Sequence, residues 1–65
     1  MTIGENIKEI RIERNMSQLQ LAREVNVTQS MIAQLERGSK TLTVPLGKEL
    51  AKVLGVSLME LIREE

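Results

Sequence analysis

The sequence predicts an all-α protein, a compact domain of five short helices. Three observations support this fold class. A capping-box pattern, in which Glu or Gln follows a Ser or Thr by three residues, begins at Thr2, Ser17 and Ser57. Apolar residues recur at helical spacing, and no segment keeps the alternation of a strand. A chain of 65 residues suffices for one small domain, so we expect residues 1–65 to form a single unit.

The first two helices are bounded by caps and asparagines. The first is expected over about residues 3–14, after Thr2, and Asn15 can end it because asparagine tolerates a left-handed conformation. The second begins after Ser17 and stops at Asn26. Their inner faces are predicted to carry Ile3, Ile7, Ile10, Leu21, Ala22 and Val25.

The remaining helices are punctuated by threonine, proline and glycine. The third is expected over 28–36 and stops at Gly38. After an irregular loop, the fourth starts near Pro45, whose missing N–H does no harm in a first turn, and Gly55 closes it. The fifth follows Ser57. The inner faces of these helices are predicted to carry Ile32, Leu35, Leu46, Leu50, Val53, Leu54, Leu58, Leu61 and Ile62.

The composition argues against several classes of function. The chain contains no His, Cys or Asp, so the usual zinc ligands, general bases and nucleophile–base pairs are missing. We therefore expect no metal, no cofactor and no enzyme activity. No apolar run is long enough to span a membrane and no leader precedes the first helix, so a cytoplasmic protein is expected. Net charge is zero, so binding of nucleic acid needs a local positive patch.

The connection between the second and third helices is the most informative feature. Only Asn26 and Val27 separate the second helix from the next cap at Thr28. So short a connection favours a steep crossing, as in a helix-turn-helix, over antiparallel packing. The small Ala22 lies where the third helix must approach closely. We therefore predict a helix-turn-helix motif over residues 17–37.

The stretch "QLQLAREVNVTQSMIAQL" resembles the helix-turn-helix of the Xre and lambdoid phage repressor/Cro family. The resemblance extends from "IGENIKEIRIERNMSQ" to "LAKVLGVSLMELI", nearly the whole chain. Asn26 departs from the glycine usual in the family, but asparagine can adopt the same positive φ. The resemblance implies a five-helix, lambda-repressor-like DNA-binding fold. The matching positions are Gln18, Ala22, Asn26, Val27, Ile32 and Leu35.

The resemblance makes the third helix the recognition helix, which lies in the major groove of DNA. Polar, uncharged side chains at its start suit hydrogen bonding to base edges, and glutamine pairs bidentately with adenine. The alternative interpretation is that these side chains are merely solvated. The base-reading residues implied are Thr28, Gln29, Ser30 and Gln34.

The same resemblance assigns supporting roles to flanking residues. Phosphate contacts are implied for Gln18, Arg37, Ser39, Lys40 and Thr41. Arg37 could equally be a solvated charge at the end of the third helix, where a cation interacts favourably with the helix dipole. Arg11 and Glu36 are implied to form a largely buried structural ion pair, the alternative being two unrelated surface charges.

The functional prediction is a sequence-specific binder of double-stranded DNA, a transcriptional regulator and by resemblance a repressor. A near-palindromic operator implies a homodimer, formed in solution or only on DNA. The competing hypotheses are an Xre-like protein-interaction module, such as an antitoxin or adaptor, and a minimal designed domain. The candidate dimer residues are Leu42, Val44, Leu58, Met59 and Ile62, although Leu58 or Ile62 could instead complete the core.

Overall fold

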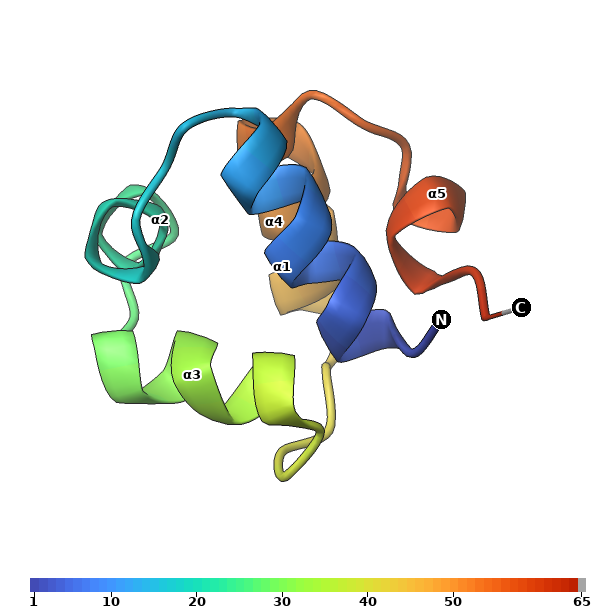
Figure 1. Ribbon diagram of the computed structural model, residues 1–65, viewed down its shortest axis with the longest axis horizontal. Coiled ribbons are helices and arrows are strands. Elements are labelled where there is room, and N and C mark those ends of the chain that lie inside the picture. Colours follow the sequence, from blue (N-terminus) through green and yellow to red (C-terminus); the bar gives the residue numbers. More distant parts are fainter. Residues whose placement is uncertain (65) are drawn as a thin grey trace.

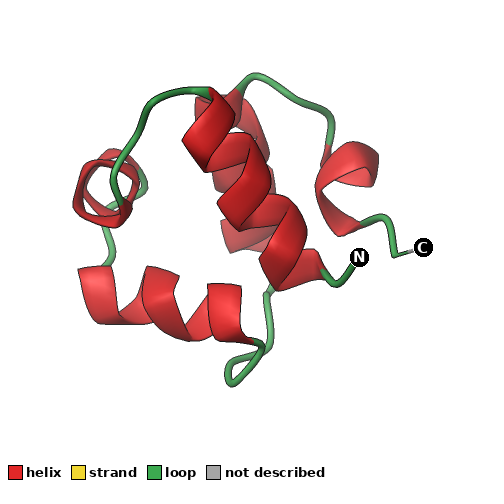
Figure 2. Ribbon diagram, viewed as in Figure 1, coloured by secondary structure: helices red, strands yellow, loops and turns green. Residues whose placement is uncertain are grey.

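The computed structural model describes residues 1–64, and these form five α-helices without any strand (Figures 1 and 2). The predicted all-α fold class is therefore confirmed. Residue 65, at which the expected domain ends, lies outside the described residues. The helices are α1 (Ile3–Glu13), α2 (Gln18–Glu24), α3 (Gln29–Arg37), α4 (Val44–Leu54) and α5 (Leu58–Ile62).

Side-chain caps set where the helices begin. All three predicted capping boxes are present; in the first, Thr2 Oγ1 accepts from the Glu5 N–H at 3.1 Å and Glu5 Oε1 accepts from the Thr2 N–H at 2.8 Å. α3 runs one residue later than expected at each end. The reason is that Thr28 has extended φ and ψ as the N-cap, while the left-handed residue that ends the helix is Gly38, after Arg37.

Left-handed backbone at two asparagines makes the early turns possible. Asn15 has φ 57° and Asn26 has φ 60°, and they are the only non-glycine residues with positive φ among residues 1–64. Asn15 follows α1, which ends at Glu13, one residue earlier than expected. Asn26 lies in the turn between α2 and α3 and has the positive φ expected at this position, where the family usually has glycine.

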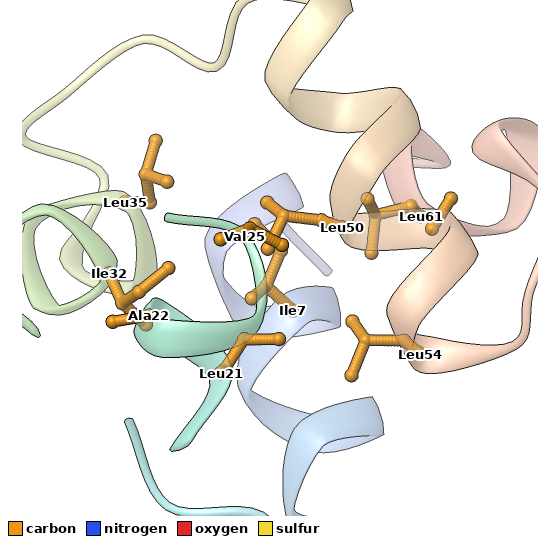
Figure 3. Close-up of a cluster of buried hydrophobic side chains, with 10 residues drawn as sticks. Ile7, Leu21, Ala22, Val25, Ile32, Leu35, Leu50, Leu54 and Leu61 are labelled. Atoms are coloured by element: carbon orange, nitrogen blue, oxygen red, sulfur yellow. The ribbon is translucent and has the colours of Figure 1, made fainter. Parts of the chain in front are cut away.

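The core is aliphatic and draws on all five helices (Figure 3). Among the buried hydrophobic side chains of residues 1–64, only Ala51 was outside the predicted inner faces. The predicted inner-face residues that are only half-buried are Ile3, Ile10, Leu46, Val53, Leu58 and Ile62. The buried set is Ile7, Leu21, Ala22, Val25, Ile32, Leu35, Leu50, Ala51, Leu54 and Leu61.

α2 and α3 cross steeply at the edge of the molecule. In Figure 1, α2 is seen end-on and α3 from the side, which confirms the predicted crossing. Within the turn, the N–H of Val27 donates to the carbonyl of Ala22 at 2.9 Å. α3 packs on α1 and α2 with its inner side, so that its outer side remains open to solvent.

Candidate nucleic-acid interface

The outer face of α3 presents polar side chains at its N-terminal end. Gln29 and Ser30 are exposed, and within residues 1–64 their side chains have no hydrogen-bond partner. Thr28 is exposed too, but its Oγ1 accepts from the Met31 N–H at 3.1 Å as the helix cap. Gln34, one turn further on from Ser30, is half-buried. Two amides and two hydroxyls therefore lie at the start and along one side of α3.

Charge near α3 is one-sided although the whole chain is neutral. Between residues 25 and 48 the sequence has three basic residues, Arg37, Lys40 and Lys48, and a single acid, Glu36. The basic residues are exposed, whereas the side chain of Glu36 is only 4% exposed. The exposed charges between residues 25 and 48 are therefore all positive, with exposed Glu24 and Glu49 bordering the segment.

Arg11 and Glu36 form a buried ion pair that joins α1 to α3. Arg11 Nε donates to Glu36 Oε2 at 2.7 Å and Nη2 donates to Oε1 at 3.1 Å, a bidentate geometry. The Arg11 side chain is 10% exposed, and its Nη1 also donates to the Met16 carbonyl at 2.8 Å. The pair thus fixes the turn after α1 as well as the last turn of α3.

Gln18, at the start of α2, joins the same group of side chains. Its Nε2 donates to Glu36 Oε1 at 3.0 Å, and the residue is half-buried. Sequence reasoning considered Gln18 only for a phosphate contact and missed this bond. Gln18 and Glu36 are 18 positions apart in the sequence, so no local spacing could reveal their hydrogen bond.

The loop after α3 is held at its start and open beyond. Gly38 is left-handed with φ 83°, and the Ser39 N–H and Oγ both donate to the Gln34 carbonyl, at 3.0 and 3.3 Å. Lys40 and Thr41 are exposed. The side chain of Lys40 therefore extends from a short anchored turn beside α3.

Apolar side chains gather on a surface away from α3. A hollow of about 330 Å³ between the loop, α1 and α5 is lined by four of the five candidate dimer residues. Val44 at its edge is 62% exposed, and the fifth candidate, Met59, is 72% exposed on the outer side of α5. The hollow is lined by Ile3, Leu42, Thr43, Val44, Leu58, Ile62 and Glu64.

Two polar side chains, Asn6 and Arg14, hold the ends of helices through hydrogen bonds that the sequence did not predict. Asn6 Nδ2 donates to the carbonyls of Leu61, at 3.0 Å, and Arg63. Arg14 Nε donates to the Leu54 carbonyl at 3.0 Å. The role of Asn6 could have been suspected from the sequence, because this polar residue interrupts the apolar inner face of the first helix beside Ile7.

Other kinds of site are not found in the part of the chain that the structure describes. Residues 1–64 contain no group of three or more acidic, His or Cys side chains able to hold a metal ion. None of the helices in this range has both the length and the apolar character that crossing a membrane requires. The features that remain are the α3 face with its flanks and the apolar surface.

The steep α2–α3 crossing, the short turn and the exposed α3 define a helix-turn-helix domain. The family model described as helix-turn-helix matches residues 7–61. The chain therefore belongs to this Xre-like helix-turn-helix family, which confirms the resemblance seen in the sequence.

Named relatives include phage and bacterial regulators. The chain is 35% identical over 65 residues to the immunity repressor protein of Bacillus phage phi105; the match covers all of this chain and 45% of that repressor, which is more than twice as long. It is 30% identical over 63 residues to control protein C.BamHI of Bacillus amyloliquefaciens, covering 95% of this chain and 78% of that protein.

Solved structures share the fold over almost the whole chain. The P22 c2 repressor in complex with a synthetic operator superposes with a TM-score of 0.92 at 26% identity, covering 100% of this chain and 98% of that one. The biofilm regulator SinR in complex with DNA gives a TM-score of 0.87 at 30% identity, covering 92% and 97%. The lambda-repressor-like five-helix fold predicted from the resemblance is therefore confirmed.

Proposed function

We propose that this chain is a sequence-specific binder of duplex DNA that acts as a transcriptional repressor, with α3 in the major groove. The observation that carries the proposal is the character of the α3 face. It offers amides and hydroxyls that can read base edges, and its flanks expose Arg37 and Lys40 while the nearby carboxylate of Glu36 is buried. The named relatives and the two operator or DNA complexes support the same function.

Base reading is assigned to the start and outer side of α3. Gln29 is the main candidate, because its exposed amide can donate to and accept from one adenine. Ser30 and the half-buried Gln34 supply further groups on that side of the helix. Thr28 keeps its hydroxyl proton free to donate while its oxygen caps the helix, and its methyl group can contact a thymine.

Phosphate contacts are assigned to the flanks of α3, namely to Gln18, Arg37, Lys40 and Thr41, and to Ser39 once its hydroxyl proton turns from the Gln34 carbonyl to a phosphate oxygen. Only two of these side chains are charged. With two phosphates neutralised per chain, log K should fall with log salt with a slope of about −1.8 per chain. This shallow slope distinguishes the proposed mode from binding by a broad basic surface.

We propose further that two copies bind together through the apolar surface. One small module covers roughly 600–1,000 Å² of DNA contact, which is little for tight specific binding. Leu42, Val44, Leu58 and Ile62 line one hollow, and a second copy seated there would cover the exposed Val44. A two-fold pair of chains calls for a near-palindromic operator. Met59 lies on the neighbouring side of α5 and extends the same surface.

A competing function uses the same apolar surface differently. A protein-interaction module would cover Val44 and Met59 with a different partner and leave the α3 face without a role. The exposure of these two side chains is the observation that favours it. DNA binding is preferred because the polar α3 face and its one-sided charge have no purpose in that alternative.

The test is a selection from random DNA duplexes at low salt. Wild type is compared with Gln29→Ala/Gln34→Ala and with Glu49→Ala/Lys52→Ala, a charge-neutral control on the exposed side of α4. We expect wild type and the control to enrich a two-fold symmetric site with half-sites about one helical turn apart, and the first variant to lose base preference while binding weakly. If wild type enriches nothing, the DNA proposal is wrong and the protein-partner alternative takes its place.

A further inference from the structure

The carboxylate of Glu36 accepts one hydrogen bond more than its ion pair requires. Arg11 alone makes a bidentate pair, at 2.7 Å from Nε to Oε2 and 3.1 Å from Nη2 to Oε1. Gln18 Nε2 adds a third bond to Oε1 at 3.0 Å from a different helix. This third donor satisfies a further lone pair of the buried carboxylate and at the same time holds the Gln18 side chain.

The bond to Glu36 fixes how the Gln18 amide is turned. One N–H of Nε2 is used, while the second N–H and Oε1 have no partner within residues 1–64. Because the amide group is planar and its nitrogen is held, these two remaining groups point in set directions. Gln18 is only half-buried, so the free end of the amide reaches solvent.

The held amide lies against the stripe of α3 that begins at Gln29. Glu36 follows Gln29 by seven residues and Ala33 by three, so the three lie on one stripe of the helix. Gln18 bonds to the last member of this stripe. In the proposed binding mode α3 lies in the major groove while α2 crosses the DNA backbone, which brings Gln18, at the start of α2, to the phosphates.

The charge of Glu36 does not oppose a phosphate at this place. Its side chain is 4% exposed and is paired with the Arg11 guanidinium, so the pair presents no net charge to solvent. An unpaired carboxylate so close to the Gln18 amide would repel DNA. Arg11 is thus needed for Glu36 to hold a phosphate-binding group.

From these contacts we infer that Glu36, neutralised by Arg11, is a positioning residue for DNA binding. It holds the Gln18 amide so that the second N–H is ready to donate to a backbone phosphate. This inference rests on the proposed DNA-binding function. Immobilising a long side chain on binding lowers affinity, and a side chain that is already held avoids most of that loss. The holding contact should raise affinity about three- to tenfold.

A double-mutant cycle on DNA affinity tests the inference. The background is Arg11→Met/Glu36→Met, because replacing both members of a buried pair by apolar residues keeps such folds stable, whereas removing one partner does not. Gln18→Ala is made in wild type and in this background. Affinity for the operator obtained by selection and for an unrelated duplex is measured at one salt concentration, with thermal unfolding recorded for every variant.

We expect Gln18→Ala to weaken binding about tenfold in wild type and threefold or less in the Met/Met background. The loss should be equal on operator and unrelated duplex, because a phosphate contact carries no sequence information. The salt slope should not change, because glutamine carries no charge. Equal losses from Gln18→Ala in both backgrounds would overturn the inference and leave the pair a purely structural role.

Gln29→Ala is the matched control, since Gln29 lies on the same stripe but has no bond to Glu36. Its effect should be the same in both backgrounds. In the free protein, the side-chain amide of Gln18 should show a high NMR order parameter that falls in the Met/Met background, while that of Gln29 does not change. If wild type binds no duplex at all, the proposed function fails as well; if it binds and the cycle is additive, only the positioning role fails.

Discussion

α3 and α5 are both held against α1, but by different kinds of contact. α3 is fixed by the charged, directional pair of Arg11 and Glu36 and by a close backbone approach, since a Cβ on Gly4 would lie 2.4 Å from the Leu35 carbonyl oxygen. α5 is held by one fully buried side chain, Leu61, and by the neutral amide of Asn6. The Asn6 amide is directional too, but it is uncharged and bonds only to the C-terminal end of α5, whereas the pair on α3 is charge-assisted and bidentate. The helix proposed to read DNA therefore has the stronger directional attachment.

The largest expected effect is on the α3 attachment. Arg11→Met leaves the Glu36 carboxylate buried without its cation and should lower the free energy of unfolding by about 3–5 kcal/mol. Urea unfolding followed by circular dichroism at low temperature measures the loss. The Arg11→Met/Glu36→Met control should recover most of it. A loss below about 1 kcal/mol for the single variant would contradict the importance of the pair.

The contact of α5 with the rest of the fold should be weakened most by removing its buried side chain. Leu61→Ala removes a fully buried side chain and should destabilise the fold by roughly 2–5 kcal/mol through lost transfer energy and a cavity. At a temperature where the variant is folded, its base preference in a DNA selection should match wild type, because α3 is held elsewhere. A changed base preference would show that α5 also orients α3.

Two glycines allow a matched comparison of the two regions. At Gly4 an added Cβ meets backbone oxygens of Leu35 and Glu36 at 2.4 and 2.6 Å, so Gly4→Ala should push α1 from α3 and cost about 1–3 kcal/mol. At Gly47 the nearest atom is the flexible end of Leu58, at 3.1 Å. Gly47→Ala should be neutral or slightly stabilising, because alanine favours the helix. Thermal unfolding of the two variants side by side decides this; equal losses would mean that α4 packs against Leu58 of α5 as tightly as α1 packs against α3.

The smallest effect concerns the start of α1 and depends on pH. The hydrogen bonds from the backbone N–H and the hydroxyl of Thr2 lower the pKa of Glu5 below its ordinary value. Its contribution to stability is therefore complete above that ordinary range and is lost as pH falls through the lowered pKa. Glu5→Gln should be slightly less stable at neutral pH and should lose less stability on acidification. Melting temperatures at pH 7 and at about pH 3 check this, and parallel losses in both proteins would rule it out.

Local signals made most of the fold predictable. The Ser and Thr caps, the left-handed residues and the helical apolar spacing act within a few positions, so they gave the helices to within a residue or two. Which aliphatic residues are fully buried was harder to predict, because Ala51 and Leu46 lie at opposite edges of the buried stripe of α4 and only packing decides which edge is covered.

The candidate site was predictable only in part. The exposed polar start of α3 follows from its sequence and its place in the motif. The Arg11–Glu36 pair was reached through family resemblance, since 25 positions separate its members. The bond from Gln18 brings α2 to the Glu36 carboxylate of α3, where Arg11 of α1 is already bound. No pairwise pattern in the sequence encodes this meeting of three helices. Gly4 was equally hidden, because its role depends on backbone atoms of a distant helix, whereas Asn6 left a signal as a polar residue within the apolar inner face of α1.

Because the net charge is zero, the excess of exposed positive charge between residues 25 and 48 is balanced by an excess of negative charge in the rest of the chain. A molecule with no net charge experiences little overall attraction to a distant polyanion, and salt screens what remains beyond about 8 Å at physiological ionic strength. At closer range the field of a polyanion turns such a molecule so that its positive side faces inward. For the proposed DNA-binding function, this charge separation favours approach with the positive segment facing the duplex.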